Sequence, residues 1–66
     1  MKNSIRIERA VKNITQAELA ELINVSRQSV IAIESAKYIP STVLAIKIAN
    51  VFNKNVEDIF ILEDND

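Results

Sequence analysis

Arg27 and Gln28 stand side by side in the sequence, directly after Ser26, a residue type that commonly caps the N-terminus of a helix. At 100° per residue, one side of the helix that follows carries Gln28, Ile31, Ala32 and Ser35. Arginine can donate two hydrogen bonds to guanine, glutamine can pair with adenine in the same way, and small apolar side chains can contact the thymine methyl group. These residue types at this spacing indicate a helix that contacts base edges in the major groove of duplex DNA.

Other kinds of chemistry have few residues to support them. The chain has no cysteine and no histidine, which excludes disulfides, Cys/His metal sites and Cys or His catalytic groups. The acidic pairs Glu57-Asp58 and Glu63-Asp64 could suggest a metal site, but helix capping and a solvated tail explain them more simply. We therefore predict that the protein is not an enzyme and needs no metal or cofactor.

The base-contacting helix is expected to be the second of a closely spaced pair. The first of the pair opens with Thr15-Gln16-Ala17-Glu18, a capping box in which the side chains of Thr15 and Glu18 satisfy free backbone N–H groups. The residues Ile23-Asn24-Val25-Ser26 then form a tight turn, where asparagine tolerates a positive φ better than most residues. Two short helices joined in this way have helix-turn-helix geometry, which places the second helix in a groove about 12 Å wide.

The first helix is predicted from about Ser4 to Lys12, because Asn13 tolerates the left-handed conformation that ends many helices. Apolar residues recur along it at the spacing of one helix face, and these are Ile7, Ala10, Val11 and Ile14. On the helix that follows, the corresponding apolar residues are Ala17, Leu19, Ala20, Leu22 and Ile23. We expect both faces to be buried in the core.

A fourth helix is predicted to begin at Ser41, because Pro40 cannot continue the helix before it, and to run to Phe52. Its inward face consists of Leu44, Ala45, Ile48, Ala49 and Phe52. A short fifth helix opens at Asn55, and the apolar run from Ile59 to Leu62 either ends this helix or becomes a strand. The chain is therefore predicted to be all-α with five helices, with room for a short β pairing of the termini.

Length and composition limit the architecture. With 66 residues, the chain is predicted to form one helix-turn-helix domain over residues 1–66, with a small core and marginal stability. No stretch approaches the ~20 apolar residues of a membrane span, and the N-terminus has no signal-peptide pattern. Because a secreted domain this short would usually contain disulfides, we expect a cytoplasmic protein with no membrane partner.

Charge is distributed unevenly along the chain, although the formal net charge of −1 at first argues against binding to nucleic acid. Residues 1–37 carry six basic and four acidic side chains, whereas residues 38–66 carry two basic and five acidic ones. Since the distribution of charge matters more than its sum, we expect any contact with DNA to be made by the N-terminal half.

Several motifs together resemble the Xre/Cro-type family of helix-turn-helix regulators. They are Thr15-Gln16-Ala17-Glu18-Leu19-Ala20, Val25-Ser26-Arg27-Gln28-Ser29-Val30, Ile33-Glu34, Pro40-Ser41, Lys47-Ile48-Ala49 and Glu57-Asp58-Ile59-Phe60. The resemblance covers nearly the whole chain, and the length and ending are most similar to compact stand-alone members of the cytolysin-repressor type. It implies a five-helix, lambda-repressor-like DNA-binding domain whose recognition helix begins at Ser26.

The resemblance also implies roles for individual residues. Gln16 would contact phosphate and brace the base-contacting residues, of which Arg27 and Gln28 occupy the first two positions. Ala32 would make only a methyl contact where relatives often have a longer polar residue, and Lys37 would touch phosphate beyond the recognition helix. The full set of predicted DNA contacts is Gln16, Ser26, Arg27, Gln28, Ser29, Ile31, Ala32, Ser35 and Lys37.

Three features of the sequence bear on stability rather than on DNA contact. In relatives an arginine–glutamate pair ties the first helix to the recognition helix, so the resemblance implies a structural ion pair between Arg9 and Glu34. Glu8 stands where many relatives have leucine, and we expect Ile7 to rotate into that core position. Relatives often have glycine where this chain has Asn13, Asn24, Ala36 and Asn53, and alanine is the least favourable of these at positive φ.

Simpler interpretations exist for several of these residues. Arg27 could be a solvated surface charge, Gln16 no more than a helix-forming residue, and Ile31 either packed against a neighbouring helix or exposed. Lys2, Arg6 and Lys12 are interpreted as solvated. The alternative function is a protein-interaction module with the same fold, such as an antitoxin or a regulatory partner, which the net charge favours slightly and the Arg27-Gln28 pair opposes.

The predicted function is sequence-specific binding of double-stranded DNA by a transcriptional repressor at an inverted-repeat operator. A homodimer is expected through Val43, Ile46 and Asn50, on the outer side of the fourth helix, together with the Ile59 to Leu62 segment. Such a dimer would place two recognition helices about 34 Å apart, which is one turn of DNA. Because isolated apolar residues are common on surfaces, the alternative is that this side is simply solvated.

Overall fold

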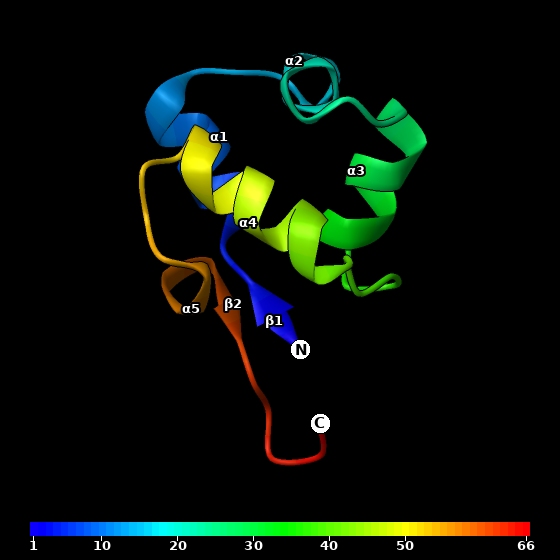
Figure 1. Cartoon of the computed structure of the whole chain (residues 1–66), viewed down its shortest axis with the longest axis vertical. Coiled ribbons are helices and arrows are strands. Elements are labelled where there is room, and N and C mark those ends of the chain that lie inside the picture. Colours follow the sequence, from blue (N-terminus) through cyan, green and yellow to red (C-terminus); the bar gives the residue numbers. More distant parts are fainter.

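The computed structural model describes residues 1–66 and consists of five helices and one pair of short strands (Figure 1). In chain order the elements are β1 (Lys2–Asn3), α1 (Ile5–Lys12), α2 (Gln16–Ile23), α3 (Arg27–Glu34), α4 (Thr42–Val51), α5 (Val56–Ile59) and β2 (Phe60–Ile61). The strands are antiparallel, with Lys2 opposite Ile61 and Asn3 opposite Phe60. The predicted helical fold and the β pairing near the termini are both confirmed. None of the five helices combines the length and the hydrophobicity that a membrane-spanning segment requires.

The helices begin where their capping residues predict. At the start of α2, the Glu18 backbone N–H donates to Thr15 Oγ1 over 3.0 Å, and the Thr15 N–H donates to Glu18 Oε1 over 2.9 Å. Ser26 accepts a hydrogen bond from the Ser29 N–H at the start of α3. These bonds satisfy backbone N–H groups that the first turn of a helix leaves free, so the predicted helix starts are confirmed.

The connections use the left-handed conformation without any glycine. Asn13, Asn24 and Asn53 have φ values of 58°, 60° and 54°, and Ala36 has a φ of 62°. Asparagine adopts this region more readily than other residues with a side chain, whereas alanine does so at a cost in energy. The predicted turn positions are confirmed, and Ala36 is the strained one.

Every helix and the second strand contribute to one hydrophobic core. Its buried members are Ile5, Leu19, Ala20, Ile23, Val30, Ile33, Ile48, Ala49, Phe52, Ile59 and Phe60. Leu44 and Ala45 on α4 pack against this core and are partly buried, as predicted. The apolar run after α5 divides into two parts, because Ile59 and Phe60 are core residues whereas Ile61 and Leu62 are exposed.

Most of the predicted inner face of the first helix is wrong, since of its four residues only Ile14, beyond the end of α1, packs partly against the core. Ile7 and Val11 are 64% and 79% exposed, and the residues that face inward are Ile5 and Glu8, one turn apart. The Ser4 backbone N–H donates to the Ile59 carbonyl over 2.9 Å, which ties the start of α1 to α5, and the adjacent Ile5 is buried in the core. Ile7 therefore does not take the core position, and Glu8 itself occupies it.

An ion pair makes the inward position of Glu8 tolerable. The Lys54 Nζ lies 2.7 Å from Glu8 Oε2, and this hydrogen bond with the carboxylate raises the pKa of Lys54 above its usual value. A buried carboxylate needs such a partner because water no longer solvates it.

The predicted face of α2 is also wrong in part. Leu19, Ala20 and Ile23 are buried as expected, but Ala17 and Leu22 are exposed. Leu22 precedes the buried Ile23 by one residue, which turns it about 100° away from the core around the helix axis. The apolar residues of α2 cover more of the helix surface than the part that contacts the core, and Leu22 therefore lies in solvent.

Replacing Ala36 with glycine should stabilise the protein. The left-handed conformation costs a residue with a Cβ about 1–2 kcal/mol, and the greater freedom of glycine in the unfolded chain offsets part of this, so we expect a net gain of roughly 0.5–1 kcal/mol. Urea or thermal unfolding measures the change. The matched control is Ala10→Gly on the exposed side of α1, which should instead destabilise by about 1 kcal/mol. A loss of stability in Ala36→Gly would contradict the strain.

Candidate nucleic-acid interface

The α2–α3 unit has the geometry of a helix-turn-helix. Asn24 ends α2 in the left-handed conformation, and the next residue, Val25, donates its backbone N–H to the Ala20 carbonyl over 3.0 Å. Ser26 then caps α3 in an extended conformation. The tight turn directs α3 across the end of α2 at one side of the molecule (Figure 1), so one face of α3 is left free of the core.

The two faces of α3 differ as its periodicity predicts. Val30 and Ile33 are buried in the core. On the other side Arg27, Gln28, Ile31 and Ser35 are exposed, and Ala32 is half-buried. The exposed face therefore presents a cation and an amide at the N-terminal end and small or apolar groups farther along. Ile31 is exposed rather than packed against a neighbouring helix, which settles one of the alternatives for this residue.

Three of the candidate residues are serines, and their hydroxyl groups already form hydrogen bonds within the protein. The Oγ atoms of Ser26 and Ser29 lie 3.0 Å apart at the start of α3, beside the capping bond. Ser35 donates its hydroxyl to the Ala32 carbonyl over 3.2 Å at the other end of the helix. These side chains thus complete the ends of α3, and a contact with DNA would have to share or replace these bonds.

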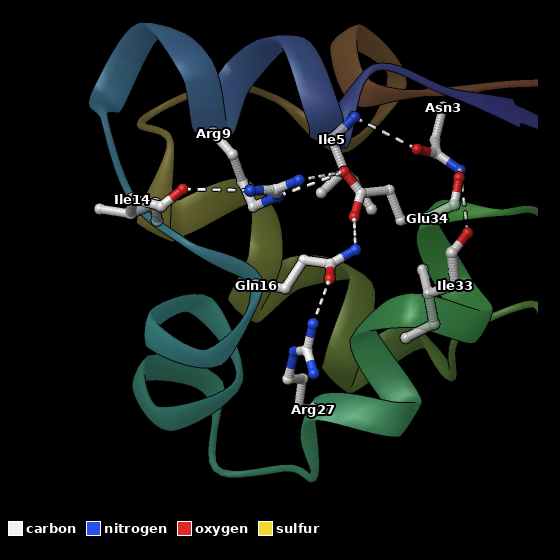
Figure 2. A network of polar contacts seen from close by, with 8 residues as sticks. All are labelled: Asn3, Ile5, Arg9, Ile14, Gln16, Arg27, Ile33 and Glu34. Atoms are coloured by element: carbon white, nitrogen blue, oxygen red, sulfur yellow. Dashed lines mark hydrogen bonds and ion pairs between the residues drawn. The ribbon is translucent and has the colours of Figure 1, made fainter.

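Gln16, the first residue of α2, joins both ends of α3. Its Nε2 donates to Glu34 Oε2 over 2.7 Å, and its Oε1 accepts from Arg27 Nη2 over 3.4 Å, as Figure 2 shows. Glu34 is the last residue of α3 and Arg27 the first. The structure therefore brings Gln16 and Arg27 together, whereas the exposed Lys37 side chain, in the loop after α3, forms no hydrogen bond or ion pair within the chain.

The predicted ion pair between Arg9 and Glu34 is confirmed. Glu34 Oε1 accepts from Arg9 Nη2 over 2.8 Å and from Arg9 Nε over 3.2 Å, and only 7% of the Glu34 side chain is exposed. The third nitrogen, Arg9 Nη1, donates to the Ile14 carbonyl over 3.1 Å in the loop between α1 and α2 (Figure 2). This one guanidinium therefore connects α1, the following loop and the end of α3.

Asn3, which the sequence did not single out as a functional or structural residue, holds the other side of the same junction. Its Nδ2 donates to the carbonyls of Ile33 and Glu34 over 3.0 and 3.4 Å, and its Oδ1 accepts the Ile5 backbone N–H over 3.2 Å. The only signal in the sequence is an asparagine just before a helix, a common capping arrangement. Its contact with carbonyls 30 residues away depends on the fold.

Replacing Arg9 with methionine should destabilise the protein by about 3 kcal/mol, because it leaves a buried carboxylate with only Gln16 as partner. Replacing both Arg9 and Glu34 with apolar residues should recover much of this loss, since no buried charge then remains. Thermal unfolding measures both effects. Lys12→Met is the matched control, since it removes the same charge from an exposed position on the same helix. Unchanged melting of Arg9→Met would show that the pair is not buried in solution.

Comparison with known proteins agrees with this geometry. The model of a helix-turn-helix family matches residues 5–59. An uncharacterized HTH-type transcriptional regulator of Methanocaldococcus jannaschii is 53% identical over 66 residues, with both chains covered completely. A second such regulator, from Archaeoglobus fulgidus, is 46% identical and covers all of this chain and 93% of its own. A third, from Bacillus subtilis, is 44% identical over 97% of each chain. The chain therefore belongs to the Xre-type helix-turn-helix family of transcriptional regulators.

Proposed function

We propose that this regulator represses transcription by binding an inverted-repeat operator in double-stranded DNA, with α3 as the recognition helix. The observation that carries the proposal is the exposed pair Arg27 and Gln28 at the start of α3, with Gln16 hydrogen-bonded to Arg27. The N-terminal residues of a recognition helix are those that meet base edges in the major groove. A domain lying there would exclude other proteins from the same DNA.

We assign the predicted contacts to two classes. Arg27 and Gln28 have the donors and acceptors to distinguish guanine and adenine, and Ile31 and Ala32 suit the methyl group of thymine. Gln16 and Lys37 are assigned to phosphate, which positions the domain on DNA without distinguishing sequences. Ser26 and Ser29 lie at the start of α3 and Ser35 at its end, and serine hydroxyls commonly contact phosphate or base edges.

The electrostatics of the N-terminal half support the proposal. Of its six basic residues only Arg9 forms an ion pair, so five cations are free: Lys2, Arg6, Lys12, Arg27 and Lys37. Of its four carboxylates, Glu8 and Glu34 are each neutralised by a cation. The free charge of this half is therefore more positive than its formal sum, which favours a polyanion despite the overall net charge of −1.

We propose a homodimer that uses the outer side of α4. Val43 and Ile46 are exposed on that side, and Ile61 and Leu62 are exposed after α5. Ile46 also lines an apolar hollow of about 250 Å³ whose other walls include Ile39, Pro40, Ala45 and Phe60. Apolar residues gathered around a hollow are typical of an interaction surface. Within the predicted Ile59 to Leu62 segment, Ile59 is fully buried in the core, Phe60 is a core residue that also lines this hollow, and Ile61 and Leu62 are exposed.

Arg27→Ala should lower affinity by about 1–3 kcal/mol and relax the base preference at one position of each half-site. Lys37→Ala should weaken binding to all sequences alike and reduce the slope of log affinity against log salt by about one unit. Selection from a random duplex pool, followed by binding titrations at several salt concentrations, measures both effects. If Arg27→Ala changes neither affinity nor preference, α3 is not the recognition helix, and a protein partner becomes the better function.

Ile46→Glu combined with Ile61→Glu should convert the dimer to a monomer and lower operator affinity, because two carboxylates would be buried in the interface. Sedimentation at micromolar concentration measures the oligomeric state, and circular dichroism should show that the helices remain. Val11→Glu on α1 is the control, since it adds a charge at an exposed apolar position outside the proposed surface. A double variant that stays dimeric would place the interface elsewhere.

A further inference from the structure

We infer that Glu34 is a positioning residue for base recognition: it sets the orientation of the Gln16 amide, and the amide in turn holds the guanidinium of Arg27. This inference rests on the proposed function, because it concerns how one of the proposed base contacts is presented. It gives the Arg9–Glu34 ion pair a role beyond joining helices. The four residues form a continuous series of hydrogen bonds from α1 to the start of α3 (Figure 2).

The two oxygens of Glu34 have separate partners. Oε1 accepts both bonds from Arg9, while Oε2 accepts the bond from Gln16 Nε2 at 2.7 Å. With only 7% of the side chain exposed, water has little access to either oxygen. The carboxylate is thus held in place by Arg9 and presents a fixed acceptor to Gln16.

This fixed acceptor determines which way the Gln16 amide faces. An ionised carboxylate can only accept hydrogen bonds, so it selects the NH₂ group of the amide and turns the carbonyl oxygen away. The oxygen then faces Arg27, whose guanidinium can only donate. In the flipped amide, oxygen would face the carboxylate and NH₂ would face the guanidinium, and neither contact would be a hydrogen bond. The network therefore supports one orientation of Gln16.

This arrangement leaves donors free for DNA. One hydrogen of Gln16 Nε2 is used by Glu34, and the second remains for a phosphate oxygen. Arg27 has five N–H donors and uses one for Gln16, so a bidentate contact with a base is still possible. The hydrogen bond from Arg27 Nη2 to Gln16 Oε1 is long, at 3.4 Å. Its role is to restrict the conformations of the exposed, flexible Arg27 side chain before DNA binds. Preorganisation of this kind favours the correct base, because that base alone matches the restricted geometry.

The test uses the full chain and the operator selected from a random duplex pool. Discrimination is defined as the ratio of affinities for the preferred and the other base pairs at the position that Arg27→Ala relaxes. Glu34→Gln introduces an amide that can donate to Gln16 Oε1, which permits the flipped orientation. We expect discrimination at that position to fall by about five-fold or more, which is the lower end of the contribution of a bidentate base contact. The salt slope should stay unchanged.

Two controls separate positioning from stability and charge. Glu21→Gln removes the same charge as Glu34→Gln, but from an exposed position on α2 outside the hydrogen-bond network. This variant should leave discrimination unchanged. Gln16→Ala removes the connecting amide but leaves the Arg9–Glu34 pair in place, so it should fold and relax discrimination at the same base pair. This second variant tests the inference even if Glu34→Gln does not fold.

Combining the variants tests whether the effect passes through Gln16. In the Gln16→Ala or the Arg27→Ala background, Glu34→Gln should cause no further loss of discrimination, because the connection is already broken. A merely structural Glu34 would instead lower affinity for all duplexes by the same factor and leave the ratio unchanged.

The possible failures can be told apart. If the wild-type protein shows no base preference that depends on Arg27, the proposed function fails and the inference fails with it. If that preference exists but Gln16→Ala leaves it unchanged, the positioning role alone is overturned. Nuclear magnetic resonance of the free protein adds an independent measurement, because the Gln16 side-chain N–H bonded to the carboxylate should be shifted away from free-amide values in the wild type, and in Glu34→Gln it should move toward those values or exchange faster with solvent.

Discussion

The nearly buried carboxylate of Glu34 is the point at which three helices meet. It accepts two hydrogen bonds from Arg9 on α1 and one from Gln16 on α2, and it lies at the end of α3. A charge in that position is tolerable only while those donors are present, so the relative placement of the three helices is constrained by electrostatics as well as by packing. In a chain of 66 residues with a small core, this electrostatic constraint contributes substantially to the orientation of α3.

The other buried carboxylate is also stabilised by a charged partner from a distant part of the chain. Glu8 occupies an inward position on α1 and pairs with Lys54, beyond the end of α4. Together with the hydrogen bonds of Asn3 to the end of α3, this pair connects distant parts of the chain by polar rather than apolar contacts. The interior thus combines eleven buried apolar residues with polar groups whose hydrogen bonds and ion pairs join different helices, and Ser4 Oγ is the one buried polar side-chain atom without a hydrogen-bond partner.

These internal pairings also decide what the surface offers to a ligand. Ion pairs remove Glu8, Arg9 and Glu34 from the free charge, and the remaining cations of the N-terminal half stay unpaired. The face of α3 that is turned away from the core is the one that carries Arg27 and Gln28. A weakly acidic protein can in this way present an unpaired guanidinium beside an amide on the exposed face of the helix proposed to enter DNA.

The sequence by itself determined the features that depend on neighbouring residues. The capping box of Thr15 and Glu18 predicted the start of α2, asparagines predicted the left-handed turns, and the period of α3 predicted its exposed and buried sides. The motifs also indicated the family and the pairing of Arg9 with Glu34. Only the tertiary structure decided that Glu8 rather than Ile7 faces inward, that Ile59 and Phe60 are core residues, and that Asn3 binds the end of α3. Those outcomes depend on how the helices and strands are placed against one another, and that placement is set by contacts between residues far apart in the chain.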